Sequence, residues 1–181
     1  MRLNGLVLSG GRSTRMGRDK GALVYRDGLD QRTHCYRILS EACASTWISC
    51  RADQVPLIPS GLPYVEDAIE GEGPAIGILS AHALDPEAAW LVLACDFPWA
   101  DAAAIRHLVQ ARNPGLAATV YVNDRGILEP LFGIWEVPAL QRLRTCFNEG
   151  NDSPREALES LACEEIPSPR PEVLVNVNSI K

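Results

Sequence analysis

The feature that most constrains the fold is an apolar run, Leu3–Leu8, that leads directly into a glycine-rich, basic loop over residues 9–20. The loop reads Ser-Gly-Gly-Arg-Ser-Thr-Arg-Met-Gly-Arg-Asp-Lys. Small residues let backbone N–H groups approach an anion closely, and Arg and Lys side chains supply countercharge. The glycines fit neither the P-loop order nor the G-x-G-x-x-G order, which disfavours the usual ATPase and dinucleotide-binding classes. The sequence therefore predicts a strand followed by a loop that binds a polyphosphate.

The charge of the whole chain makes this loop stand out. The 181 residues carry a formal net charge of −6, which argues against a general nucleic-acid-binding protein. The loop alone holds four basic side chains and one acidic side chain, namely Arg12, Arg15, Arg18 and Lys20 against Asp19. An acidic protein with one basic loop is suited to a small anion. The alternative is a solvated surface loop without a ligand.

Composition also limits the class of protein. A hydrophobic content of 46% and a charged content of 22% are typical of a soluble globular protein, and the length suits one domain over residues 1–181. No apolar run approaches the roughly 20 residues that span a bilayer, and the N-terminal residues lack a signal-peptide pattern, so we expect a cytoplasmic protein. The six cysteines are dispersed without a C-x-x-C pair, which disfavours a zinc site or a disulfide framework.

Short apolar runs alternate with helical patterns along the chain. This alternation predicts an α/β domain with a mostly parallel central sheet flanked by helices. Strands are expected over 3–8, 46–50, 64–66, 90–94 and 173–178, and two more, over 117–122 and 131–135, are expected to form a small β excursion such as a hairpin. Helices are expected over 32–45, from Pro74, after an N-cap at Asp101, and over 138–147 and 154–161.

Polar residues follow several of the expected strands. Asp67 follows the strand at 64–66, Asp96 follows the strand at 90–94, and Asn178 ends the last one. Ligands of open α/β sheets lie beyond the carboxyl ends of the strands, so these residues and the basic loop are expected to converge. A carboxylate beside bound phosphates needs a cation between them, and Mg²⁺ takes one or two carboxylates together with phosphate oxygens. The pattern predicts metal-assisted nucleotidyl transfer, although each acidic residue has a helix cap or a turn as its alternative role.

The motifs resemble those of one known family. Residues 8–20 resemble the signature L-x-G-G-x-S-x-R-M-G-x-D-K of the molybdenum cofactor guanylyltransferases, the MobA-like branch of the nucleotidyltransferases. Further matches follow in the family's order, at residues 66–67, 73–81, 95–98, 129–135 and 176–179. The resemblance therefore covers essentially the whole chain.

The resemblance implies a Rossmann-like domain over residues 1–181 that joins GMP from GTP to molybdopterin, with Mg²⁺ as cofactor and pyrophosphate as product. Matched by position, it implies nucleotide contacts at Leu8, Ser9, Gly10, Gly11, Ser49 and Asp67, phosphate binding by Arg15 and Lys20, and a Mg²⁺ site at Asp96 that Asn178 completes. Arg155 lies where a basic residue could contact the pterin phosphate. The implied partners are GTP, the molybdenum cofactor, and cofactor-biosynthesis proteins or acceptor molybdoenzymes in transient contact, without nucleic acid or membrane.

Two other functions share parts of this pattern. A molybdopterin cytidylyltransferase or a sugar-phosphate nucleotidyltransferase has the same general layout, but Gly10-Gly11 and Asp19-Lys20 favour guanine. A non-catalytic nucleotide-binding relative is the alternative from another class. The retained charges of the site argue against it, whereas the end of the sequence at Lys181, where relatives usually continue into a final helix, argues for it.

Overall fold

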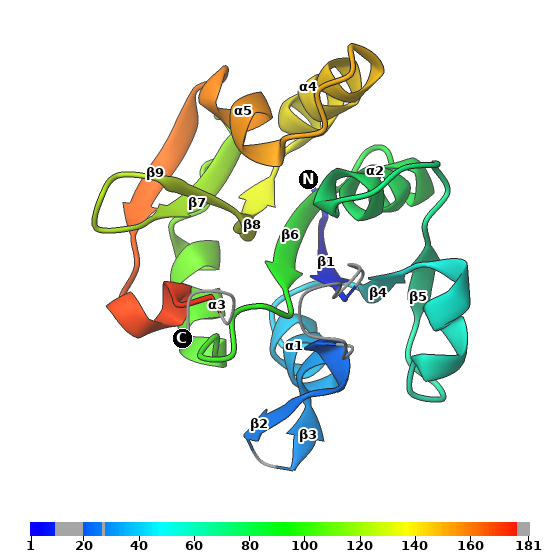
Figure 1. Cartoon of the computed structure of the whole chain (residues 1–181). Helices are drawn as coiled ribbons and strands as arrows, with labels where there is room; N and C mark the ends of the chain where they lie inside the picture. Colours follow the sequence, from blue (N-terminus) through cyan, green and yellow to red (C-terminus); the bar gives the residue numbers. More distant parts are fainter. Residues whose placement is uncertain (10–19, 27, 177–181) are drawn as a thin grey trace.

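The computed structural model describes residues 1–9, 20–26 and 28–176. In these residues seven strands form one sheet in the order β5-β4-β1-β6-β8-β7-β9 (Figure 1). The strands are β1 (Leu3–Leu8), β4 (Thr46–Cys50), β5 (Tyr64–Glu66), β6 (Ala89–Ala94), β7 (Ala118–Val122), β8 (Leu128–Trp135) and β9 (Cys163–Pro167). Strands β5, β4, β1 and β6 are parallel, β8 is antiparallel to both β6 and β7, and β9 is parallel to β7. The single, mostly parallel α/β domain expected from the sequence is confirmed.

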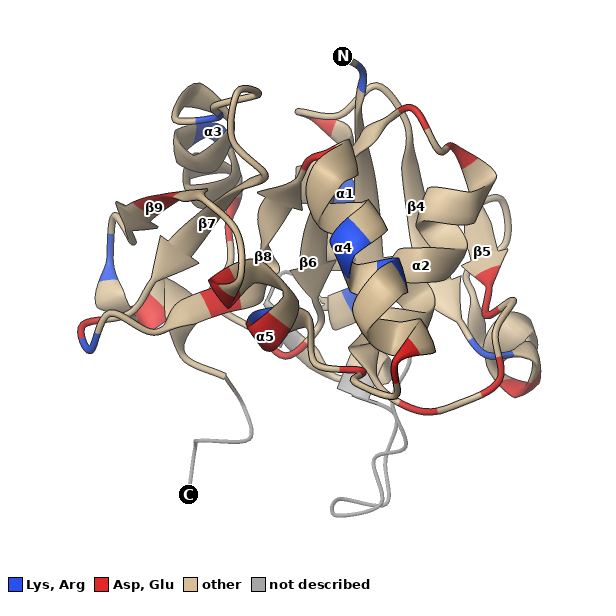
Figure 2. Cartoon of the chain, turned by 90° about the horizontal axis from the view of Figure 1, so that it is seen from above, with Lys and Arg blue, Asp and Glu red and all other residues tan. Residues whose placement is uncertain are grey.

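Helices cover both faces of this sheet. They are α1 (Gln31–Ser40), α2 (Pro74–Leu84), α3 (Ala102–Gln110), α4 (Val137–Asn148) and α5 (Pro154–Glu159), with 3-10 segments η1 (Lys20–Ala22), η2 (Ala52–Leu57) and η3 (Pro171–Leu174). Helices α1 and α3 contact each other on one face, and α2, α4 and α5 lie on the other, where Figure 2 shows α2 and α4 side by side. Among the described residues, none of the helices has both the length and the apolar character of a membrane span.

The central strands β1 and β6 are apolar except for the buried Asn4, as expected for parallel strands covered on both faces. Every residue of β1 and of β6 is buried. Their pairing aligns Leu8 with Ala94, and β4 pairs with β1 up to Ser49. The three strands therefore end at the same edge of the sheet, and the residues that follow them are brought together there.

The helices begin where capping residues allow. The Asp101 carboxylate accepts a hydrogen bond from the Ala104 N–H at 2.9 Å, which confirms the predicted N-cap of α3. Pro74 is the first residue of α2, as predicted. Helix α1 is shorter than the predicted 32–45, because it ends at Ser40. It begins at Gln31, one residue before the predicted start, and Asp30 is its N-cap.

The β-hairpin expected near residue 125 is present but belongs to the main sheet. Strands β7 and β8 pair in antiparallel fashion, and β8 also pairs with β6. The separate small ribbon of the fold is a different one, formed by β2 (Val24–Arg26) and β3 (Leu29–Asp30). Pairing with β6 is a long-range contact, which the local turn pattern does not encode.

The strand predicted over 173–178 is wrong for its described part. Residues Pro171–Leu174 form η3, with Val173 fully buried, and no strand is present from there to residue 176. The last strand is β9, which the sequence pattern missed. Glu164, Glu165 and Pro167 make β9 read as a polar loop, but charged residues and Pro are common on an edge strand.

Candidate functional site

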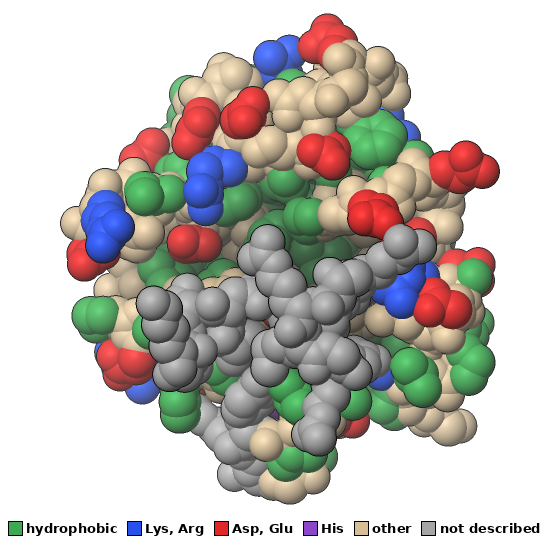
Figure 3. Space-filling view, viewed as in Figure 1, with side chains coloured by type: hydrophobic (Ala, Val, Ile, Leu, Met, Phe, Trp, Pro, Cys, Tyr) green, Lys and Arg blue, Asp and Glu red, His purple; other side chains and the backbone are tan. Residues whose placement is uncertain are grey.

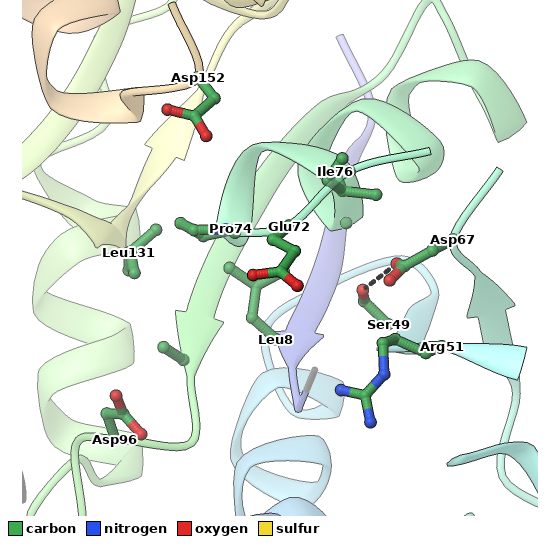
Figure 4. A pocket seen from close by; sticks show the side chains of 14 residues that line it. Leu8, Ser49, Arg51, Asp67, Glu72, Pro74, Ile76, Asp96, Leu131 and Asp152 are labelled. Atoms are coloured by element: carbon green, nitrogen blue, oxygen red, sulfur yellow. Dashed lines mark hydrogen bonds between the residues drawn. The ribbon is translucent and has the colours of Figure 1, made fainter. Parts of the chain in front are cut away.

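A cavity of about 590 Å³ opens at the edge where β1, β4 and β6 end. This volume lies within the roughly 300–1,000 Å³ typical of small-molecule sites. Figure 3 shows a hollow with hydrophobic side chains at its floor and charged side chains around it. The lining residues are Leu8, Ser49, Arg51, Asp67, Gly71, Glu72, Gly73, Pro74, Ile76, Gly77, Ala94, Asp96, Leu131 and Asp152 (Figure 4).

Helix α2 forms one wall of the cavity through its N-terminal turn. Gly71 and Gly73 precede it with φ angles of 141° and 100°, a region that favours glycine. A Cβ atom on Gly77 would lie 2.3 Å from Ser49 Oγ and 2.8 Å from Leu8 Cδ2, so only glycine permits this close packing. The first N–H groups of α2, which lack intrahelical acceptors, are thus held near the cavity, where they favour an anion.

Ser49 and Asp67 form a polar pair beside this wall. Ser49 is buried, and its Oγ donates to Asp67 Oδ1 at 3.4 Å. The Asp67 N–H donates to the Cys50 carbonyl at 2.9 Å, which extends the β4–β5 pairing. Burial raises the pKa of Asp67 above its ordinary value of 3.8, while the Ser49 hydrogen bond and the charge of Arg51 oppose this rise. The pair presents a carboxylate acceptor to the cavity.

Arg51 lies next to this pair and was not predicted as a site residue. Its Nε and Nη2 donate to the two carboxylate oxygens of Asp53 at 2.9 Å each. Its backbone N–H donates to Gln54 Oε1 at 3.1 Å at the start of η2. The sequence did contain a signal for it, because Arg51 follows the strand at 46–50 directly, as Asp96 nearly follows its own strand.

Asp96 lies on the other side of the cavity, beyond the end of β6 (Figure 4). The Cys95 N–H donates to the Leu8 carbonyl at 3.1 Å, and the Gln31 side chain donates to the Phe97 carbonyl at 3.1 Å. The backbone is therefore anchored on both sides of Asp96. Its half-buried carboxylate has little conformational freedom left to lose on binding a ligand.

The donor set at Asp96 is compatible with Mg²⁺. Within the described ranges no three His, Cys, Asp or Glu side chains are grouped so that they could hold a metal ion. The protein therefore offers only part of a coordination shell in these ranges, with a carboxylate as its hard oxygen ligand. Mg²⁺ is usually bound in this way, through one or two carboxylates, substrate phosphates and water. The residues fit a metal ion that binds together with a polyphosphate.

The described lining residues make the cavity acidic. They include the carboxylates of Asp67, Glu72, Asp96 and Asp152 but a single guanidinium, that of Arg51. Opposite charges across a few ångströms interact strongly in a partly buried site, and like charges repel equally strongly. A polyphosphate bound here therefore requires further positive charge, from a metal ion or from other basic residues.

The structure brings together four of the predicted site residues, Leu8, Ser49, Asp67 and Asp96, in the cavity lining. Ser9 lies beside them, with its Oγ donating to the Ser49 carbonyl at 2.8 Å. Predicted site residues outside the described part of the chain are Gly10, Gly11, Arg15 and Asn178, together with the side chain of Lys20, whose backbone begins η1.

The remaining residues are one that the resemblance suggested and three that line the cavity without having been predicted. Arg155 does not line the cavity, and its Nε donates to the Leu128 carbonyl at 3.2 Å. Glu72 lies in the Gly-Glu-Gly-Pro segment that predicted the start of a helix, but nothing in that pattern indicated that Glu72 lines the cavity. Asp152 and Leu131 reach the cavity from the distant second half of the chain, through contacts that no local pattern encodes.

Comparison with known proteins agrees with this geometry. The sequence model of the MobA-like NTP transferase domain matches residues 5–166. A molybdenum cofactor guanylyltransferase of Pseudomonas aeruginosa is 31% identical, over 97% of this chain and 94% of that protein. A molybdenum cofactor biosynthesis bifunctional protein of Synechocystis is 35% identical over 98% of this chain. The chain spans about half of that relative's length, 51%.

Two solved structures share the fold. Molybdopterin-guanine dinucleotide biosynthesis protein A from Archaeoglobus fulgidus superposes with a TM-score of 0.73 at 23% identity, covering 91% of this chain and 83% of that one. A nucleotidyl transferase from Methanothermobacter superposes with a TM-score of 0.74 at 18% identity, covering 98% and 92%. At these identities the similarity concerns the fold alone.

Proposed function

The chain belongs to the MobA-like NTP transferase family and is a nucleotidyltransferase, and on that premise we propose that it transfers GMP from GTP to molybdopterin. The product is the guanine dinucleotide form of the molybdenum cofactor, and pyrophosphate is released. The main support is one arrangement, a cavity at the ends of parallel strands with the Ser49–Asp67 pair on one side and Asp96 on the other. A relative at 31% identity bears the name of this activity.

The reaction is a displacement at the α-phosphorus of GTP. An oxygen of the acceptor's terminal phosphate forms a bond to that phosphorus, and the bond to the bridging oxygen of the β-phosphate breaks. Pyrophosphate leaves with the bonding electron pair. A phosphate nucleophile is already ionised at neutral pH, so the chain needs no general base for this step. Its residues act by positioning the two substrates and by balancing charge.

The roles of the described residues are proposed from their place in the cavity, and those of the other residues from the family resemblance of their motifs. Leu8 and the Ser49–Asp67 pair are proposed to hold the nucleoside, and the loop from Ser9 to Lys20, with Gly10, Gly11 and Arg15, is proposed to hold the triphosphate. Asp96 is proposed to hold Mg²⁺ with Asn178, and the ion would neutralise charge on the phosphate oxygens. Arg15 and Lys20 are further proposed to stabilise the departing pyrophosphate.

The acceptor is proposed to enter from the side of Leu131 and Asp152, across the cavity from the Ser49–Asp67 pair. This side comes from the second half of the chain and contributes the apolar side chain of Leu131 and the carboxylate of Asp152. The whole chain, residues 1–181, is proposed to act as one domain. Cytoplasmic location and transient contacts with other cofactor-biosynthesis proteins or acceptor molybdoenzymes are part of the proposal, since the product must be handed on.

A pyrophosphate-release assay tests the function. The purified protein is incubated with molybdopterin cofactor, Mg²⁺ and one of GTP, CTP, ATP or UTP. We expect release with GTP, none without acceptor, and none after removal of the metal with EDTA. Release with CTP in place of GTP would identify a cytidylyltransferase, and tight GTP binding without any release would identify a non-catalytic relative.

A further inference from the structure

Asp152 lines the cavity, but the proposed mechanism assigns no contact to its carboxylate. It lies between α4 and α5, and Figure 4 shows it on the side of Leu131, away from Ser49 and Asp67. A Cβ atom on Gly73 would lie 3.9 Å from Asp152 Oδ2, so the carboxylate stands beside the N-cap of α2. That N-cap has no side-chain hydrogen bond, and Asp152 forms no hydrogen bond or ion pair with the residues that the structure describes. With respect to these residues, both of its oxygens are available as acceptors.

The backbone on both sides of Asp152 is held by hydrogen bonds. The Asn151 N–H donates to the Cys146 carbonyl at 2.9 Å, at the end of α4. The Ser153 N–H donates to Asn151 Oδ1 at 3.0 Å, and Ser153 Oγ accepts from the Glu156 N–H at 3.3 Å as the N-cap of α5. Asn151 Nδ2 also donates to Glu156 Oε2 at 2.8 Å. The short side chain of Asp152 therefore starts from a fixed backbone and loses little conformational entropy when it binds a ligand.

The surroundings of Asp152 limit which groups can bind beside it. The lining also carries the carboxylates of Asp67, Glu72 and Asp96, and a phosphate placed next to Asp152 would be repelled. An ionised carboxylate only accepts hydrogen bonds, and two adjacent N–H donors match its two oxygens. Leu131, on the same side of the cavity, offers an apolar contact. This part of the cavity therefore suits a ring with N–H donors along one edge.

We propose that Asp152 binds the heterocycle of the acceptor and orients it, an inference that rests on the proposed transfer of GMP to molybdopterin. The pyrimidine ring of a pterin carries an N3–H and a 2-amino group side by side, and Asp152 accepts one hydrogen bond from each. The substituent with the phosphate lies at the opposite end of the pterin, so this phosphate is directed away from Asp152. A ring with a carbonyl in place of the 2-amino group presents an acceptor to the carboxylate and is rejected.

Pyrophosphate release at saturating GTP and Mg²⁺, with the concentration of molybdopterin varied, tests the proposal. We expect Asp152→Ala to raise the KM for molybdopterin about tenfold, with little change in kcat or in GTP affinity. Asp152→Asn keeps one acceptor oxygen, so its KM should lie between those of the wild-type protein and Asp152→Ala. Glu149→Ala removes the same charge from an exposed residue at the end of α4 that does not line the cavity, and it should behave as wild type.

Two competitors of the acceptor identify the group that Asp152 binds. In 6-hydroxymethyllumazine a carbonyl replaces the 2-amino group of 6-hydroxymethylpterin. The wild-type protein should prefer the pterin about tenfold, and Asp152→Ala should lose that preference. An unchanged or lower KM in Asp152→Ala overturns the proposal, as does a wild-type protein without the preference or a variant that keeps it. Equal losses of acceptor and GTP affinity would mean that Asp152 acts through the start of α2, which also overturns it. A wild-type protein that releases no pyrophosphate would instead count against the proposed function.

Discussion

The two halves of the sheet differ in strand direction and contribute to the cavity in different ways. In the first half, β5, β4, β1 and β6 are all parallel, and each residue that ends or follows a strand emerges at the same edge. This half supplies Leu8, Ser49, Asp67 and Asp96. The parallel topology alone therefore brings residues from four separate segments into one cavity.

In the second half, β8 reverses direction against both of its neighbours. Its N-terminal part therefore lies at the same edge as the end of β6, and Leu131 reaches the cavity from within the strand. Asp152 comes from the segment between α4 and α5. The first half holds the polar pair and Asp96, and the second half closes the cavity through Leu131 and Asp152, on the side proposed for the acceptor.

The largest difference between the halves is expected in turnover, when an aspartate of each half is replaced by asparagine and its charge is removed. Asp96→Asn, in the first half, should lower turnover by roughly 10²–10⁴-fold, because transition-state charge stabilisation by a metal is worth several kcal/mol. Asp124→Asn, the same chemical change in the exposed β7–β8 turn, should leave the rate within about twofold, as expected of an exposed site. Pyrophosphate release at saturating Mg²⁺ measures both. Unfolding midpoints check that the variants fold, and a wild-type rate in Asp96→Asn would remove that residue from the mechanism.

The same division explains how much of the fold the sequence predicts. Strands β1, β4 and β6 of the first half are mostly buried, and the pattern located them, together with the short and exposed edge strand β5, nearly to the residue. In the second half, β9 is an edge strand with two glutamates, and its pattern is that of a loop. Residues 173–175 are apolar, but Val173 and Leu174 belong to the 3-10 segment η3, which buries Val173, and they do not join the sheet. Pairing with β7 makes residues 163–167 a strand, whereas burial of Val173 accompanies a 3-10 turn, and a local pattern does not reveal either contact.

The site divides in a similar way. Residues within two positions of the end of a predicted strand, such as Asp67 and Asp96, could be assigned to the cavity from topology alone. Arg51 meets the same criterion and could have been found by applying it to every strand. Asp152 could not, because its place depends on how α4 and α5 pack against the sheet. Local sequence thus predicts the half of the site built on strand ends, and tertiary packing decides the rest.

Substitution of one glycine in each half distinguishes an effect on stability from an effect on nucleotide binding. A Cβ atom on Gly77 would lie 2.3 Å from Ser49 Oγ, and one on Gly133, in β8, would lie 2.5 Å from Val120 Cγ1. Overpacking of this kind typically costs about 1–3 kcal/mol, and the better helix propensity of Ala offsets up to about 1 kcal/mol of it at Gly77. Both Gly77→Ala and Gly133→Ala should therefore lower the free energy of unfolding measured with urea.

Only Gly77→Ala should also lower the affinity for GTP, on the order of tenfold. The added methyl group displaces Ser49, and the hydrogen bond from Ser49 to Asp67 is then lost. Gly133→Ala leaves the polar pair in place, so its GTP affinity should match that of the wild-type protein under conditions where it is fully folded. Equal losses of affinity in the two variants would mean that the cavity responds to global stability and not to the local packing of α2.

The smallest expected effect is a difference in the pH dependence of stability between two half-buried carboxylates. Burial raises the pKa of Asp67 above 3.8 in the first half and that of Glu129 above 4.5 in the second. In each case the unfolded chain releases the proton at a lower pH than the folded protein does. As the pH rises from the ordinary value to the raised one, the folded state binds more protons than the unfolded state, so stability falls through that window.

Asp67→Asn and Glu129→Gln each remove one such contribution. Relative to the wild-type protein, each variant should gain unfolding free energy as the pH rises through its window, and the gain should level off above it. Urea titrations at a series of pH values that starts at about pH 3.5, below the ordinary pKa of both carboxyls, measure this difference. The two carboxylates are expected to differ in their effect on GTP affinity, because of the two only Asp67 lines the cavity, beside Ser49 and Arg51. Glu129→Gln should therefore leave GTP affinity unchanged at every pH, and a loss there would extend the nucleotide site into the second half of the sheet.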